Sequence, residues 1–352
     1  KRQGDDTTTD LTSASNTIVL TAEDEIGGNA ATMSTDTAGA IEVAANSALD
    51  VSSTTAGNLV LSGAGVLTLT DLDTTDGSIT VSAGGALTAT DVVAGGGTGD
   101  SVTLSTTTGG AVATLVTGAD AVSITADAGD ITIGAVTATA GTLGVTATTG
   151  SINDAADDST ADFTAVGLIT LTAQDEIGVL GSGTDTDLEF AASSSVNVST
   201  TGTGAIDLDG LGALTLSDVD TADGTITVTS AGALTVTDVA TGNNNAIALT
   251  TSSGDITGLA TVNAGSGAVT LNAAGAIVDD SDASTVVTGG VLTADAAGAI
   301  TIDSTVTSAD ISTSASGAIA LDETDGITLT DLDTTDGSIT VSAGGALTAT
   351  DV

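Results

Sequence analysis

The chain has 352 residues, a formal net charge of −44, and no Pro, Cys, His, Trp or Tyr. Nucleic acid repels a polyanion of this kind, and the sequence has no run of 18 apolar residues that would span a membrane. Low complexity and high charge would also fit a disordered chain, but 40% hydrophobic residues and regular alternation predict a folded β protein.

Short apolar triplets recur along most of the chain. Residues 1–16 contain none and are expected to form a loose lead-in, whereas residues 17–352 are expected to form one continuous β-solenoid. Each triplet alternates apolar and small or polar residues, which is the period of a strand, and the triplets recur at a nearly regular spacing. The clearest triplets are Ile79-Thr-Val81, Val102-Thr-Leu104, Val122-Ser-Ile124, Leu143-Gly-Val145, Ile169-Thr-Leu171, Val196-Asn-Val198, Leu214-Thr-Leu216, Ile226-Thr-Val228, Ile247-Ala-Leu249, Val269-Thr-Leu271 and Ile300-Thr-Ile302.

A longer repeat supports the same period. Residues 68–92 and 328–352 are identical, and residues 215–239 are a variant of the same segment. Coils of ~21 to ~23 residues divide both intervals between successive copies, so the sequence predicts a parallel β-helix of roughly 16 coils. Ile79 and Val81 would point inward and Thr80 and Ser82 outward. A hairpin-based sandwich fits less well, because hairpins do not repeat at a fixed period of this size.

The third recurring feature is a cluster of aspartates before a glycine. Carboxylate oxygens suit Ca²⁺, a hard cation that takes six to eight oxygen ligands, so these clusters are candidate calcium sites. The spacing departs from an EF-hand loop, and the alternative is that they are solvated turns, since Asp favours turns without any metal. The candidate ligands are Asp71, Asp73 and Asp76 in the first copy, Asp218, Asp220 and Asp223 in the second, and Asp331, Asp333 and Asp336 in the third.

Units of the form GxITLTA give the chain a family resemblance. Examples are Gly167-Leu-Ile-Thr-Leu-Thr-Ala173, Gly224-Thr-Ile-Thr-Val-Thr229 and Gly298-Ala-Ile-Thr-Ile302. In these units the chain resembles the repeat regions of filamentous-haemagglutinin-type adhesins and other giant bacterial surface proteins. The resemblance implies a right-handed parallel β-helix that is secreted and displayed at the cell surface as a long fibre. The family's amino-terminal secretion domain is not seen here, and the near absence of Lys and Arg is unusual for it.

Partners and alternative functions follow from the same features. Exposed strand edges at the ends of a solenoid favour association of copies end to end or side by side, and a surface fibre would contact glycans or other cells. The chain would continue beyond Val352 as part of a longer fibre, or act as one subunit of it.

Two alternative functions remain. A polysaccharide-binding or polysaccharide-cleaving β-helix would need acid pairs such as Asp157-Asp158, but with no His and only two basic residues we expect no enzyme. An ice-binding solenoid would use Thr-x-Thr rows such as Thr68-Leu-Thr70, Thr88-Ala-Thr90 and Thr235-Val-Thr237, although these pairs do not recur in every coil.

Overall fold

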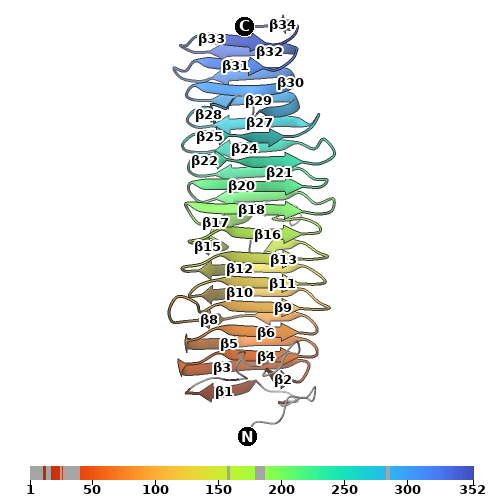
Figure 1. The fold of residues 1–352 in the computed structure, drawn as a ribbon, viewed down its shortest axis with the longest axis vertical. Helices are drawn as coiled ribbons and strands as arrows, with labels where there is room; N and C mark the ends of the chain where they lie inside the picture. The colour runs from red at the N-terminus through yellow and green to blue at the C-terminus, as the bar shows by residue number, and fades with distance from the viewer. Residues whose placement is uncertain are drawn as a thin grey trace. The chain divides into compact units, whose positions relative to one another are not determined.

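Parallel β-strands make up the regular structure of the described residues. The computed structural model describes residues 11–12, 17–23, 26, 40–156, 159–178, 187–282 and 286–352, and within these ranges it contains no helix. The fold is a parallel β-solenoid with about 21 residues per turn, as the sequence predicts (Figure 1). The expected lead-in lies outside the described residues except for Leu11 and Thr12, and Leu11 forms a parallel bridge with Val43.

The chain divides into two compact units. The first comprises residues 1–157 and 162–173, and the second residues 158–161 and 174–352. Strands of the first unit are β1 (Ile18–Ala22), β2 (Ile41–Val43), β3 (Ser47–Ala56), β4 (Leu59–Gly63), β5 (Leu67–Asp76), β6 (Ile79–Ala83), β7 (Leu87–Ala89), β8 (Val92–Ala94), β9 (Val102–Thr106), β10 (Ala111–Gly118), β11 (Val122–Ala126), β12 (Ile131–Ala138), β13 (Leu143–Ala147), β14 (Ile152–Asp154), β15 (Phe163–Ala165) and β16 (Ile169–Ala173).

The second unit contains the remaining strands. They are β17 (Leu188–Phe190), β18 (Ser194–Thr200), β19 (Ile206–Gly210), β20 (Leu214–Thr221), β21 (Ile226–Ser230), β22 (Leu234–Val236), β23 (Asp238–Thr241), β24 (Ile247–Thr251), β25 (Ile256–Leu259), β26 (Thr261–Asn263), β27 (Ala268–Ala273), β28 (Ile277–Asp279), β29 (Val287–Ala296), β30 (Ile300–Thr313), β31 (Ile319–Glu323), β32 (Ile327–Thr334), β33 (Ile339–Ala343) and β34 (Leu347–Ala349).

Alternation along each strand builds the core. Ile79 and Val81 of β6 are buried and Thr80 between them is exposed, which confirms the predicted orientation. Parallel pairing places Ile79 beside Val102 and Val81 beside Leu104 of β9 one turn later, so like residues stack on like. Each fully buried Val, Leu or Ile contributes about 1.5–3 kcal/mol, so this stacking is the main stabilising interaction of the fold.

Threonines that point inward stabilise the turns between strands. Thr221, Thr251 and Thr200 are buried at strand ends, and each hydroxyl donates to a backbone carbonyl three or four residues later, at 2.7, 3.0 and 2.9 Å. Thr74 makes the same bond to the carbonyl of Gly77. A buried hydroxyl needs a partner, and here that partner is the backbone of the turn. These hydrogen bonds therefore stabilise the turns that position the outward residues of the neighbouring strands.

The number of turns differs from the prediction. The described strands make about 14 turns, fewer than the roughly 16 that an even division of the chain predicts. Coil length is uneven, because the turn that joins Ile79 to its partner Val102 is longer than the turn that joins Leu59 to its partner Ile79. Extra residues enter the loops between strands, which accept insertions without disturbing the paired strands.

Candidate functional site

The first aspartate motif lies on β5 and the turn after it. Leu72 and Thr74 point into the core, so Asp71 and Asp73, which directly precede them, point outward and are exposed. Asp50 of β3 pairs in register with Asp71, and the backbone N–H of Leu72 donates to the carbonyl oxygen of Asp91 at 3.0 Å. Three successive turns therefore bring Asp50, Asp71 and Asp91 into one column, with Asp73 beside it. We call these four residues the first Asp ladder.

The described residues include no Lys or Arg, so none of them relieves the electrostatic repulsion within the first Asp ladder. The side chain of Asp73 is exposed but its carboxylate is partly desolvated, and this partial burial, followed by the negative charges of Asp71, Asp91 and Asp50, raises its pKa. One carboxylate oxygen of Asp91 is buried and makes no hydrogen bond to the described residues. An oxygen in this position is suited to a cation ligand, because burying an unpaired acceptor costs free energy.

The second copy forms an equivalent ladder with one substitution. Asn197 of β18 pairs with Asp218 of β20, and its Nδ2 donates to Asp218 Oδ2 at 3.0 Å. Asp238 lies one turn later, because Val219 pairs with Val239. Burial, followed by the hydrogen bond and charge of Asp218 and the charge of Asp238, raises the pKa of Asp220 to about 6. We call Asn197, Asp218, Asp220 and Asp238 the second Asp ladder.

The third ladder repeats the pattern on the surface. Asp310 of β30 pairs with Asp331 of β32, and Leu332 N–H donates to the carbonyl oxygen of Asp351 at 3.2 Å. The charge of Asp333 raises the pKa of Asp331, followed by burial and then by the charges of Asp351 and Asp310. We call Asp310, Asp331, Asp333 and Asp351 the third Asp ladder.

The last aspartate of each motif does not join its ladder. Asp76 is hydrogen-bonded to Asp100, whose pKa is raised mainly by burial, and Asp100 Oδ2 accepts the N–H of Gly97 at 3.1 Å. Asp223 Oδ1 instead accepts Asn245 Nδ2 at 2.9 Å. Asp336 is exposed on the turn after β32. The first two aspartates of each motif therefore lie apart from the third. The carboxylates that could share a cation come mainly from neighbouring turns rather than from one stretch of sequence.

The glycine that follows each motif has a structural explanation. A Cβ at Gly77, Gly224 or Gly337 would lie 2.3, 2.0 or 2.1 Å from a carbonyl oxygen of the previous turn. Real Cβ atoms do not approach this closely, so the glycine permits the backbones of two turns to stack. It is therefore no evidence for a cation-binding loop.

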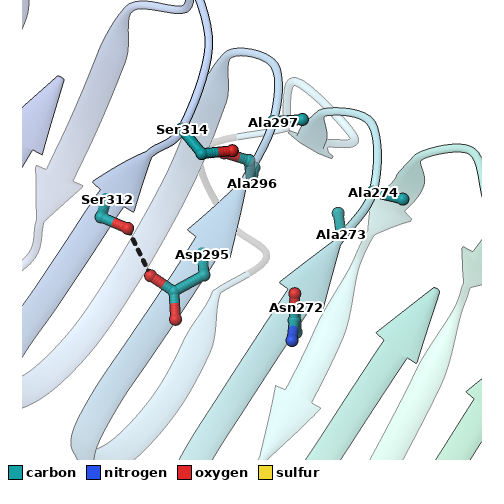
Figure 2. A pocket seen from close by; sticks show the side chains of 8 residues that line it. All are labelled: Asn272, Ala273, Ala274, Asp295, Ala296, Ala297, Ser312 and Ser314. Carbon is teal, nitrogen blue, oxygen red and sulfur yellow. Dashed lines mark hydrogen bonds between the residues drawn. The ribbon is translucent and has the colours of Figure 1, made fainter. Parts of the chain in front are cut away.

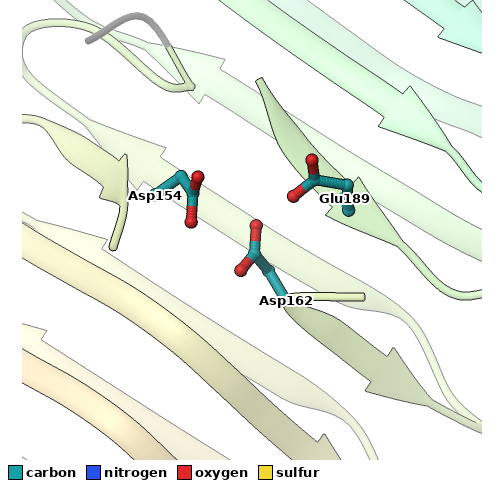
Figure 3. Close-up of side chains that lie close together, drawn as sticks. All are labelled: Asp154, Asp162 and Glu189. Carbon is teal, nitrogen blue, oxygen red and sulfur yellow. The ribbon is translucent and has the colours of Figure 1, made fainter. Parts of the chain in front are cut away.

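Interior carboxylates form a second group that the sequence analysis missed. In the first unit, Asp154 at the end of β14 and Asp162 just before β15 are 9% and 3% exposed, and each offers a carboxylate oxygen within 4.8 Å of the other (Figure 3). Asp154 also accepts the N–H of Ala156 at 2.9 Å. In the second unit, Glu189 in the middle of β17 is 1% exposed. Asp154 follows the inward residue Ile152 by two positions, which is the signal that would have placed it inside.

Glu323 is the best-defined interior acid of the second unit. It is 1% exposed and accepts Ser304 Oγ at 2.6 Å and the N–H of Val306 at 3.1 Å. Burial raises its pKa, and these hydrogen bonds oppose the rise. Glu323 follows Ile319 and Leu321 in the inward phase of β31, so the strand period predicts its position.

Stacked acids also occur away from the three motifs. Burial raises the pKa of Asp207 on β19 to about 6, and the charge of Asp209 adds to the effect. The pKa of Asp303 on β30 is raised by burial and then by Asp279, Asp322 and Asp280. Asp303 pairs with Asp322 across turns, so an acidic column also occurs on β30 and β31, whereas Asp207 and Asp209 are neighbours along one strand.

A shallow hollow lies beside the ends of β27, β29 and β30. Figure 2 shows that alanines and small polar side chains line it, and that Ser312 donates a hydrogen bond to Asp295. Asn272 and Ser314 complete the polar part of the lining. The hollow offers hydrogen bonds but only one acidic group.

Comparisons with protein-family models, curated proteins and solved structures found no match for the chain. The parallel β-solenoid is shown by the structure, and the more specific likeness to adhesins depends on the residue pattern alone. Across the described ranges, no helix is long and apolar enough to cross a membrane.

Proposed function

We propose that the chain is a non-enzymatic structural protein that forms an extracellular fibre on a bacterial cell surface, with Ca²⁺ bound along its Asp ladders. The observation that carries the proposal is the recurrence of an in-register acidic column in a stack of like coils. A solenoid buries its core by stacking and presents any repeated outward residue as a column. Such a protein is suited to forming a long fibre at a cell surface rather than to enclosing a substrate.

Calcium is the cofactor that the ladders fit. Each ladder supplies three or four carboxylates on neighbouring turns, at the ~4.8 Å spacing of paired strands. Ca²⁺ takes six to eight oxygens in flexible geometry, so bridging carboxylates and water would satisfy it. The buried, unbonded oxygen of Asp91 supports this interpretation, because a cation would remove the cost of its desolvation.

Calorimetric titration with CaCl₂ and thermal unfolding with and without a chelator test the calcium proposal. Calcium is expected to release or absorb heat and to raise the melting temperature. Asp73→Asn should weaken this response, whereas Asp127→Asn, which changes an exposed acid outside the ladders, should leave it unchanged. Absence of binding heat together with an unchanged melting temperature would rule out calcium stabilisation.

Self-association is the partner interaction that the fold supports best. β33 and β34 of the second unit pair with β31 and β32, and strand pairing of the same kind would join one copy to another. Backbone N–H and C=O groups at strand edges favour strand addition. Contacts with surface glycans or other cells would then occur along the fibre, and its acidic charge disfavours nucleic acid.

Immunogold labelling of intact cells that produce the protein tests the location. Labelling of filaments outside the cell is expected. Label confined to the cell interior would contradict the proposal of a surface fibre. Electron microscopy of the purified protein, at increasing concentration, tests end-to-end or side-by-side assembly.

A further inference from the structure

The first and second Asp ladders have the same construction but differ in chemistry. Each lies directly after a shift in strand register, which falls between Leu49 and Asp50 in the first unit and between Val196 and Asn197 in the second. An irregularity of this kind redirects the side chains beside it. The two ladders can therefore be compared position by position, and the comparison shows which of them is better suited to a cation.

Asp91 distinguishes the first ladder. The residue one turn earlier is Asp71, and the residue one turn later is Leu115, as the pairing of β8 with β5 and with β10 requires. Asp71 repels the carboxylate of Asp91, and the side chain of Leu115 offers it no hydrogen bond. Oδ1 of Asp91 is buried and makes no hydrogen bond to the described residues. An enclosed carboxylate oxygen without a donor costs free energy, which a bound cation would recover.

The second ladder meets the same needs with groups of the protein itself. Asn197 lies where the first ladder has Asp50, and its Nδ2 donates to Asp218 Oδ2 at 3.0 Å. Thr261 pairs with Asp238 and supplies a hydroxyl where the first ladder has a leucine. Across the described residues, this ladder contributes no carboxylate oxygen that is both buried and unbonded.

The two ladders also differ in charge. The first has four carboxylates, whereas the second has three and the amide of Asn197. Calcium affinity rises with the number of charged oxygen ligands. A cation that enters between Asp50 and Asp71 relieves repulsion, but one that enters between Asn197 and Asp218 must first break their hydrogen bond.

We propose that calcium binds the first ladder in preference to the second, with Asp71, Asp73 and Asp91 as its carboxylate ligands, and that Asn197 is the residue that disfavours the ion in the second ladder. The inference rests on the calcium binding proposed above and adds where along the chain it occurs. Removal of calcium then weakens the structure around β3, β5 and β8 and leaves that around β18 and β20 unchanged.

Amide hydrogen exchange, followed by mass spectrometry while calcium is added to the full chain at neutral pH, reports the two ladders separately. Peptides that cover β3 report the first ladder, and peptides that cover β18 and β20 report the second. Residues 68–92 recur at 328–352, so peptides from within that segment do not identify a ladder. We expect half of the protection at β3 to appear at a calcium concentration about tenfold lower than at β18 and β20, equivalent to about 1.4 kcal/mol.

Two substitutions test the roles of the residues. Asn197→Asp removes the amide donor and supplies a fourth carboxylate, so it should lower the half-protection concentration of the second ladder about tenfold and leave the first unchanged. Asp91→Asn should raise that of the first ladder by a similar factor and leave the second unchanged. It adds no charge, so it provides the test even where Asn197→Asp does not fold. Asp127→Asn, which changes an exposed acid outside the ladders, is the control and should alter neither.

Equal half-protection concentrations at the two ladders of the unmodified chain, or a lower one at the second, would overturn the inference while calcium binding itself stood. An unchanged response of the first ladder in Asp91→Asn would overturn it as well. Calcium-dependent protection at neither ladder would instead refute the proposed calcium binding, and the inference with it.

Discussion

Asp220→Asn should make the second unit less sensitive to pH, because Asp220 is the ladder residue with the largest rise in pKa. Its pKa is raised from 3.8 to about 6 by burial and by Asp218 and Asp238. A group whose pKa is raised on folding contributes stability that is complete below its unfolded pKa and is lost as the pH rises through its folded pKa. The unmodified protein is therefore expected to lose stability between about pH 4 and about pH 7 in the absence of divalent cations.

The size of the effect follows from the shift after allowance for solvent. A rise of about two pKa units corresponds to about 3 kcal/mol at 1.36 kcal/mol per unit. Although partial burial of its carboxylate is the first cause of the raised pKa, the residue Asp220 is still exposed to solvent. Water and salt therefore screen its interactions, and we expect about 1 kcal/mol. Asparagine is not ionised at any of these pH values. The substitution should therefore stabilise β20 at neutral pH and have little effect near pH 4.

Amide hydrogen exchange of the peptide that covers β20 is the suitable assay. Long repeat arrays do not always unfold as one unit, so a global unfolding curve would mix the ladder with distant coils. Protection is measured in a chelator across the range from about pH 4 to about pH 7 and corrected for intrinsic exchange rates. Asp127→Asn serves as the control because it removes one charge outside the ladders. If the unmodified protein gains protection as the pH rises, or if Asp220→Asn keeps its full slope, the reasoning is wrong.

Three further pairs of substitutions test other parts of the structure. Asp50→Asn gives the first Asp ladder the residue that Asn197 provides in the second ladder, and it should raise the melting temperature at neutral pH by the equivalent of about 0.5 kcal/mol. The reverse change, Asn197→Asp, should lower the melting temperature. Shifts of the same sign and size in both variants would contradict the pairing. Glu323→Ala leaves a buried hydroxyl and N–H unpaired and should cost about 1–3 kcal/mol in urea unfolding, more than Glu323→Gln, which retains an acceptor. Gly224→Ala should be strongly destabilising in a thermal melt because its Cβ would lie 2.0 Å from a carbonyl oxygen, while Gly97→Ala, whose Cβ meets nothing within 4 Å, should be tolerated.

The fold can be predicted from the sequence because each coil repeats the same alternating pattern of apolar and polar residues. The triplet Ile79-Thr-Val81 specifies a strand by its period, and the next triplet supplies a partner of the same shape one turn later. The number of turns was predicted less well. An average period cannot show where residues accumulate in turns, as they do between Ile79 and its partner Val102.

The grouping of the aspartates in space could be predicted only in part from the sequence. Spacing along the chain grouped Asp71 with Asp73 and Asp76, but the structure separates Asp76 and adds Asp50 and Asp91 from neighbouring turns. Asp91 lies in the same repeated segment as Asp71 and follows it by one coil length, so the period of the solenoid would have connected them. Asp50 lies outside the repeat and could be placed only from the register of β3 with β5.

The same geometry explains both the acidic ladders and the neutral columns of outward Ser and Thr residues, such as Thr80, Thr103 and Ser123. In a parallel solenoid an outward residue that recurs once per turn meets its own kind at strand spacing. For Asp this contact is repulsive, and the repulsion adds to burial, which is the first cause, in raising the pKa of Asp73 and of Asp220. For Ser and Thr the contact is neutral or favourable, since cross-strand hydroxyl pairs hydrogen-bond. A side chain that recurs once per turn therefore forms an extended surface. A column of carboxylates needs protons or cations to reduce its repulsion, whereas a column of hydroxyls needs only water as a hydrogen-bond partner.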